Sequence, residues 1–164
     1  MSFTLIAGTP ILTNQGNISI ELLRPGIHTI RNKKIVEITK TRNIDNYLVC
    51  IEENALGQNI PCQKTIMSPN HKIFYKGKMI EAKFFTGIIP TIYEINYNNE
   101  LLYNVVMEQY DKMMVNNLIC ETLHPENGTA KLFAAFKTLD ISDKLKLNKH
   151  VNIYNNEMRL IDNS

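Results

Sequence analysis

The segment Ser68-Pro69-Asn70-His71 holds the side chains best suited to chemistry. It places a hydroxyl and an imidazole three residues apart, at a turn between two apolar runs. Pro69 fixes its own φ and disfavours helical geometry for Ser68, while Asn70 tolerates turn geometry. Such a corner can hold an imidazole rigidly for proton transfer. The alternative is a structural histidine at the polar tip of a half-buried strand.

Two further segments accompany this corner. Thr4–Gly26 contains Gly-Thr-Pro-Ile and ends in Leu-Arg-Pro-Gly, and residues 102–119 contain a turn around Asp111 between two apolar runs. In this order and at this spacing, the three segments resemble the Hint domain, the autoprocessing fold shared by hedgehog C-terminal domains and inteins. The resemblance covers about residues 2–126. The stretch 121–132 looks most like Hint-containing proteins of large DNA viruses.

The resemblance implies a self-cleaving centre of four residues. In Hint chemistry a nucleophile in the first segment attacks the preceding carbonyl and turns an amide into an ester or thioester. A histidine protonates the departing amide nitrogen, and a hydroxyl or backbone group steadies the oxyanion. On this sequence Thr4 takes the nucleophile position. Ser68 and His71 form the central block, and the late block contains Asp111.

The sequence departs from the family pattern at three points. Thr4 stands where the family usually has cysteine, and an alcohol that keeps its proton near neutrality is a much poorer nucleophile. Only three residues precede Thr4, so we expect no sizeable N-terminal segment to be released. Glu121 and Thr122 stand where inteins end in histidine and asparagine. Without that asparagine no side-chain amide can cyclise and cut the main chain, so we do not expect splicing.

Each candidate residue also has a structural interpretation. Thr4 can simply begin the first strand. Ser68 and Asn70 can organise their turn through hydrogen bonds from side chain to backbone. Asp111 can be a hairpin-turn residue. His71 is the strongest catalytic candidate of the set, although it too can be a relic of lost chemistry.

The composition of the 164 residues is that of one ordinary globular chain. Apolar residues make up 44% and charged residues 21%, which argues against disorder. A net charge of +2 without a basic cluster gives no reason to expect binding to nucleic acid or to an anionic membrane. No apolar run approaches the ~20 residues that span a bilayer, and the first residues lack the charged region of a signal peptide. These features, together with the resemblance to viral Hint proteins, lead us to expect a cytoplasmic or virion protein that is not secreted by a signal peptide.

Metal and cofactor binding are not expected. An odd number of cysteines without a C-x-x-C pair indicates reduced thiols. Their spacings to the histidines do not match those of a zinc site. The residues considered are Cys50, Cys62, Cys120, His28, His71, His124 and His150.

Residues 4–123 read as short strands separated by turns, which predicts an all-β domain. Together with the resemblance, this gives the expected fold class: an all-β, Hint-like disc or horseshoe with two pseudo-symmetric halves, over residues 1–126. The local predictions are strands at 35–40 and 47–51, a hairpin over 73–80 turning at Gly77, one helical turn at 20–23, and a loop at 54–61.

Residues 127–164 are predicted to form a second unit, a short α-helical C-terminal extension. Apolar residues recur there at spacings of three and four, on two helices separated near residues 140–143. We expect this stripe to pack on the β domain, and the alternative is a contact with a partner or with a second copy. The stripe consists of Leu132, Phe136, Leu139, Leu147, Val151, Tyr154, Met158 and Ile161.

Three functions remain open at this point. The sequence favours a Hint-derived domain that has lost self-cleavage and serves as a structural or interaction module within a viral particle, with proteins or other copies of the chain as partners. The second is an active autoprocessing domain that uses Thr4 with His71. The third is a plain β-rich interaction protein whose resemblance is coincidental.

Overall fold

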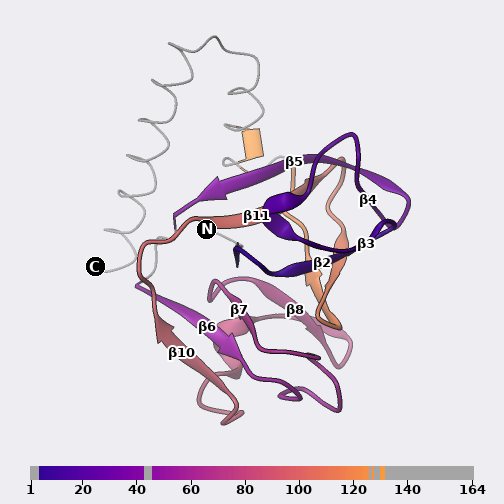
Figure 1. The fold of residues 1–164 in the computed structure, drawn as a ribbon. Helices are drawn as coiled ribbons and strands as arrows, with labels where there is room; N and C mark the ends of the chain where they lie inside the picture. Colours follow the sequence, from indigo (N-terminus) through magenta and orange to yellow (C-terminus); the bar gives the residue numbers. More distant parts are fainter. Residues whose placement is uncertain (1–3, 43–45, 126, 128–129, 132–164) are drawn as a thin grey trace.

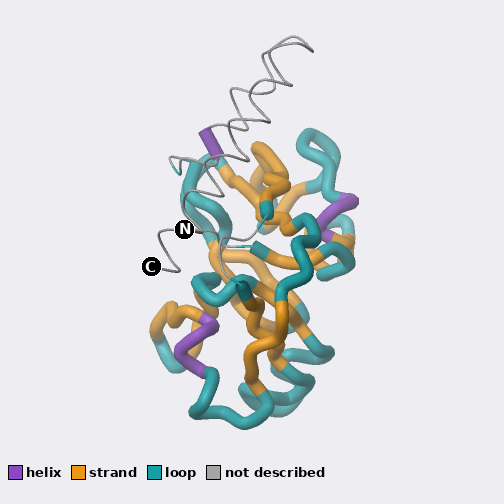
Figure 2. Tube along the Cα trace, turned by 90° about the vertical axis from the view of Figure 1, so that its left-hand side faces the viewer, coloured by secondary structure: helices purple, strands orange, loops and turns teal. Residues whose placement is uncertain are grey.

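The computed structural model describes residues 4–42, 46–125, 127 and 130–131. Nearly all of this part of the chain is strand, turn or loop (Figures 1 and 2). Two 3-10 turns, η1 (Ile20–Leu22) and η2 (Ala82–Phe85), lie within it. For the described residues, the structure confirms both the all-β prediction and the predicted helical turn at 20–23.

The largest sheet contains seven strands, in the spatial order β10 (Ile92–Asn96), β6 (Tyr47–Ile51), β7 (Thr65–Met67), β1 (Leu5–Ile6), β11 (Leu102–Met107), β5 (Lys33–Thr41) and β4 (Thr29–Ile30). All neighbouring strands are antiparallel. The short β1 lies in the middle, where Leu5 is opposite Met67 on one side and Tyr103 on the other. The nine-residue β5 follows β11 along most of its length (Figure 1). The sheet therefore brings the start of the chain beside two distant segments.

A second sheet contains four strands, in the order β12 (Lys112–Val115), β13 (Leu118–Glu121), β8 (Lys72–Tyr75) and β9 (Lys78–Glu81). Each of its two hairpins turns on two residues with positive φ, a geometry whose twist matches that of the flanking strands. These are Asn116 and Asn117 with φ of 50° and 70°, and Lys76 and Gly77 with 49° and 84°. The predicted hairpin over 73–80 is confirmed. The third sheet is the hairpin of β2 (Pro10–Thr13) and β3 (Gly16–Ser19).

The core is built mainly from aliphatic side chains on alternating strand positions. In β12, Met113 and Val115 are buried, whereas Lys112 and Met114 are only half-buried. Each fully buried large side chain contributes roughly 1.5–3 kcal/mol relative to an exposed one. The largest are Leu5, Ile11, Ile20, Ile30, Leu48, Ile51, Met67, Ile73, Ile92, Leu102, Met107 and Met113.

A smaller apolar cluster lies near the end of the described residues, and it consists of Val106, Leu123 and Ala130. Ala130 and Lys131 have helical geometry, and the Lys131 N–H donates to the Asn127 carbonyl at 2.9 Å. The predicted helices beyond this point, with their apolar stripe, lie outside the described residues. The boundary at residues 126 and 127 therefore stays a prediction.

Candidate functional site

The backbone of Thr4 is fixed on both sides by Ser68. The Thr4 N–H donates to Ser68 Oγ at 2.9 Å, and the Ser68 N–H donates to the Thr4 carbonyl at the same distance. Both residues are buried, and they lie just outside the paired strands β1 and β7. The hydroxyl of Ser68 therefore faces the amide nitrogen that a Hint reaction would release.

The Thr4 side chain is in a different situation. Its Oγ1 is buried and has no hydrogen-bond partner among the residues that the structure describes. A buried hydroxyl without a partner costs free energy, and a nucleophilic hydroxyl needs a base within hydrogen-bond reach to remove its proton. No basic group of the described residues lies within hydrogen-bond distance of the Thr4 hydroxyl.

His71 lies beside Thr4 in a fully buried position. Its Nε2 donates to the Glu121 carbonyl at 3.2 Å, and its ring also interacts with the Thr4 backbone. Its own N–H donates to the Ser68 carbonyl at 3.1 Å, which closes the predicted turn. The predicted strand–turn–strand corner is confirmed, because β7 ends at Met67 and β8 begins at Lys72.

Burial lowers the pKa of His71 from 6.5 to about 4, although the hydrogen bonds to the backbone of Glu121 and Thr4 raise it in part. The imidazole is therefore neutral near pH 7, where only about one molecule in a thousand carries the extra proton. A general acid of this kind is strong when protonated but is rarely protonated.

Glu121 is a site residue that the sequence interpretation missed. Besides its carbonyl contact with His71, it is buried and accepts from the Lys72 N–H at 3.3 Å and from the Tyr110 hydroxyl at 2.9 Å. Burial raises the pKa of its carboxyl, and burial with the Glu121 contact raises the pKa of Tyr110 to about 12. Alternation along β13 places Glu121 on the same face as the half-buried Ile119, so its burial has no local signal in the sequence.

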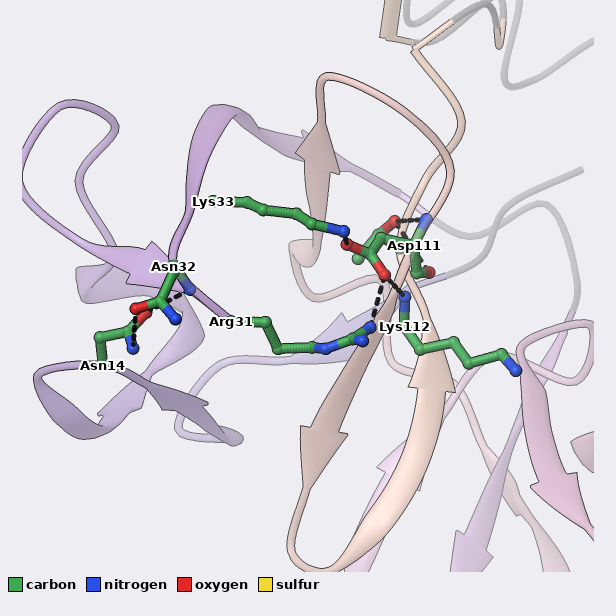
Figure 3. Close-up of polar contacts among 7 residues, drawn as sticks. Asn14, Arg31, Asn32, Lys33, Asp111 and Lys112 are labelled. Carbon is green, nitrogen blue, oxygen red and sulfur yellow. Dashed lines mark hydrogen bonds and ion pairs between the residues drawn. The ribbon is translucent and has the colours of Figure 1, made fainter.

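The Asp111 carboxylate forms ion pairs with Arg31 and Lys33 (Figure 3). One carboxylate oxygen lies 2.7 Å from Arg31 Nη1 and the other 2.8 Å from Lys33 Nζ. Partial burial works against its ionisation, but the hydrogen bonds from Lys33 and the Lys112 N–H and the charge of Arg31 outweigh it and lower its pKa. We expected Thr4, His71 and Asp111 in one cleft. The structure places the His71 ring beside the Thr4 backbone. The Asp111 carboxylate instead forms ion pairs with Arg31 and Lys33.

Neither a metal-binding cluster nor a disulfide is found in the described part of the chain. No group of three or more His, Cys, Asp or Glu side chains there could hold a metal ion. Cys50, Cys62 and Cys120 are unpaired thiols, and burial raises the pKa of Cys120 well above its usual range. Within the same residues, no helix is long and apolar enough to cross a membrane.

Comparison with solved structures finds the same architecture elsewhere. A bacterial intein-like domain from Clostridium thermocellum aligns with a TM-score of 0.59 and 14% identity, over 74% of this chain and 100% of that one. A DnaB intein from Synechocystis sp. PCC 6803 aligns with a TM-score of 0.49 and 10% identity, over 74% and 99% of the two chains. At such low identity the first of these likenesses establishes the fold alone.

Sequence comparison identifies the family. No curated protein matches the chain. A family model described as the Hint domain, however, matches residues 3–127, which include Thr4, the Ser68–His71 corner and Asp111. Because the matched part is most of the 164 residues, the chain belongs to the Hint domain family.

Proposed function

We propose that this chain is a Hint domain that has lost self-cleavage and acts as a structural or interaction module. The observation that carries the proposal is the state of the Thr4 hydroxyl, which is buried without a hydrogen-bond partner among the described residues. A hydroxyl with an unperturbed pKa far above neutrality attacks an amide only when a neighbouring base takes its proton. No described residue accepts a hydrogen bond from the Thr4 hydroxyl.

The state of His71 supports the same conclusion. A departing amide nitrogen needs a proton, and the pKa of about 4 leaves the imidazole neutral at neutral pH. Without a base, attack by the Thr4 hydroxyl would be slow. Without a protonated His71, departure of the amide nitrogen would be slow as well. The Hint fold is nonetheless retained, as expected for a domain that keeps the fold of its family after losing self-cleavage.

The finer form of this proposal places the module in a viral particle, with proteins or other copies of the chain as partners. Its support is the resemblance of residues 121–132 to Hint-containing proteins of large DNA viruses. In that setting the chain would act by contact with its partners.

The second candidate is an active autoprocessing domain that uses Thr4 with His71. The double contact between the Thr4 backbone and Ser68 favours it, because Ser68 Oγ already lies 2.9 Å from the nitrogen that cleavage would release. Such preorganisation of the leaving group is what an active centre needs.

The two candidates differ in the fate of a fusion protein. A reporter with about ten linking residues is placed upstream of Thr4, and the intact mass is followed with and without dithiothreitol or hydroxylamine. We expect the fusion to stay unbroken, because neither a thioester nor an ester forms. Release of the reporter at the bond before Thr4, abolished by His71→Ala in the same fusion, would establish the active domain instead.

A further inference from the structure

A groove of about 500 Å³ lies away from Thr4 and His71, beside the edge strand β12. Its size falls in the roughly 300–1,000 Å³ range of ligand pockets in proteins. The residues that line it come from the β2 hairpin, the end of β4, and the β12–β13 hairpin. They are Leu12, Thr13, Asn14, Ile30, Arg31, Lys112, Met113, Met114 and Ile119.

The walls of the groove are mostly aliphatic. Ile30 and Met113 are buried beneath it, whereas Met114 and Ile119 are half-buried and Leu12 is 45% exposed. Leu12 is among the more exposed large apolar side chains of the described residues. A ligand with an aliphatic body would remove these surfaces from water, which is favourable in proportion to the apolar area covered.

Arg31 is placed at this groove by an unusual backbone. It has φ of 53° and precedes Asn32 with φ of 64°, in the turn between β4 and β5. Asparagine and glycine fit such a turn, whereas a long side chain in the left-handed region is strained. Lys76 has the same geometry in the β8–β9 hairpin, so this turn fixes the position of Arg31 without itself marking a site.

Asn14 locks the turn in place. The Asn32 N–H donates to Asn14 Oδ1 at 2.8 Å, and Asn14 Nδ2 donates to Asn32 Oδ1 at 3.0 Å. From this anchored tip the Arg31 side chain reaches across to Asp111, as Figure 3 shows. The Arg31 side chain therefore lines the groove while its guanidinium is held on Asp111, next to the lining residue Lys112.

The charge around the groove is positive. Arg31 and Lys33 share the single carboxylate of Asp111, so one unit of positive charge is left over. The Arg31 side chain is 60% exposed and contacts Asp111 through Nη1. A guanidinium carries five N–H donors, so this contact uses only part of them. Lys112 also lines the groove, but its Nζ lies 5.0 Å from the centroid of the Phe74 ring, which does not line it, so the charge at the groove comes from Arg31. None of the described residues that line the groove is acidic.

We propose that this groove binds a medium-chain aliphatic carboxylate. The aliphatic chain lies against Leu12, Met114 and Ile119, and the carboxylate pairs with the guanidinium of Arg31. An aliphatic wall with a cation at its border complements a monoanion that carries an apolar tail. The site is separate from the self-cleavage centre and does not depend on whether Thr4 reacts.

The test uses the full chain and decanoate as the probe, with decanol and decyltrimethylammonium as matched ligands of other charge. Backbone amide shifts in two-dimensional NMR are followed as each ligand is added below its aggregation concentration. We expect saturable shifts for decanoate at the groove residues, and weaker binding of both matched ligands.

Variants separate the two halves of the site. Arg31→Asn removes the cation and keeps a residue that accepts left-handed geometry, so it should fold and bind decanoate about tenfold more weakly. Leu12→Ser should weaken the binding of decanoate and of decanol to a similar extent. Lys40→Gln is the control, because Lys40 is an exposed cation of β5 that does not line the groove.

Three results would overturn the proposal. The first is the absence of saturable decanoate shifts in the intact chain. The second is equal affinity for decanoate, decanol and decyltrimethylammonium, since the groove would then not select an anion. The third is binding to vesicles of anionic phospholipid without binding to dispersed decanoate, which would make the surface a membrane contact.

Discussion

Glu121 orients the imidazole of His71 across fifty positions of sequence, since its carbonyl oxygen lies 3.2 Å from His71 Nε2. A carbonyl can only accept, so in the neutral ring Nε2 carries the proton. The Glu121 carboxylate also accepts from the N–H of Lys72, the residue after His71. Backbone and side chain of one residue thus hold both the ring and the strand that presents it.

The buried state of His71 predicts a pH-dependent stability. Its folded pKa of about 4 lies below the unfolded 6.5, so the unfolded chain takes up the proton first as the pH falls. Stability from this group is complete above pH 6.5 and is lost as the pH falls toward 4. We expect the contribution of His71 to the free energy of unfolding in urea to be about 2 kcal/mol lower at pH 5 than at pH 8.

The contribution of His71 is isolated by comparison with His71→Gln. Glu121 acts in the opposite direction, because its raised pKa makes the folded state hold a proton more tightly as the pH falls. The variant keeps Glu121 and lacks the imidazole, so its stability should depend less on pH between 4 and 6.5. Equal pH dependence in the two proteins would show that His71 is not buried in its neutral form.

The parts of the fold that depend on local chemistry could be predicted from the sequence. Gly77 marked the hairpin of β8 and β9, and Pro69 marked the corner before His71, because turn residues act through their own backbone geometry. The pairing of β1 with β7 and β11 has no local signal. The expectation that Thr4 lies beside His71 came from the family resemblance and not from periodicity.

The contacts of Asp111 could not be predicted in this way. Its partners Arg31 and Lys33 lie 80 and 78 positions away, and nothing near residue 111 indicates them. The role of Glu121 was hidden for a related reason, since it acts on His71 through a backbone carbonyl that every residue carries. The chemistry of a side chain can be inferred from the sequence, whereas a long-range contact of the backbone cannot.

Replacing Thr4 by cysteine tests whether the nucleophile is the main defect. A cysteine at pH 7 is a few per cent thiolate and is intrinsically far more nucleophilic than an alcohol. With the Ser68 contacts to the backbone of residue 4 retained, we expect the upstream fusion of Thr4→Cys to release its reporter slowly when dithiothreitol is added. Intact mass spectrometry gives the rate, and the Thr4 fusion treated in parallel is the control. No release by Thr4→Cys would mean that the centre is deficient beyond its nucleophile.

Ser68→Ala tests the contact that fixes Thr4. The change leaves the Thr4 N–H buried without its acceptor, which costs about 1–3 kcal/mol. Ser19→Ala is the matched control, because the Ser19 side chain makes no capping hydrogen bond at η1. Urea unfolding should show a clear loss for Ser68→Ala and a change within about 0.5 kcal/mol for Ser19→Ala. Equal effects would mean that the hydroxyl of Ser68 is not needed to hold Thr4.

Asp111→Asn tests the ion pairs at the third candidate residue. The amide keeps the size of the side chain but loses its charge, so Arg31 and Lys33 are left as neighbouring cations. Both cations are well exposed and screened, so we expect a modest loss of about 1 kcal/mol that shrinks in high salt. Glu94→Gln removes an exposed acid from β10 and serves as the control. A larger loss that salt does not change would indicate a packing defect instead.

A deletion tests the predicted C-terminal extension at residues 127–164. Ala130 is buried against Val106 and Leu123, so the chain is still anchored on the β domain where the extension begins. Five apolar side chains of the predicted stripe lie within residues 141–164, and burial of each would contribute roughly 1.5–3 kcal/mol. This would exceed the weak helix propensity of an asparagine-rich segment. The five are Leu147, Val151, Tyr154, Met158 and Ile161. We therefore expect deletion of residues 141–164 to lower Tm by about 5 °C or more, and deletion of 162–164 to leave it unchanged. An unchanged Tm together with loss of self-association would assign the stripe to contacts between copies. Rapid amide exchange throughout 144–161 in the intact chain would contradict both, because a packed stripe protects its backbone.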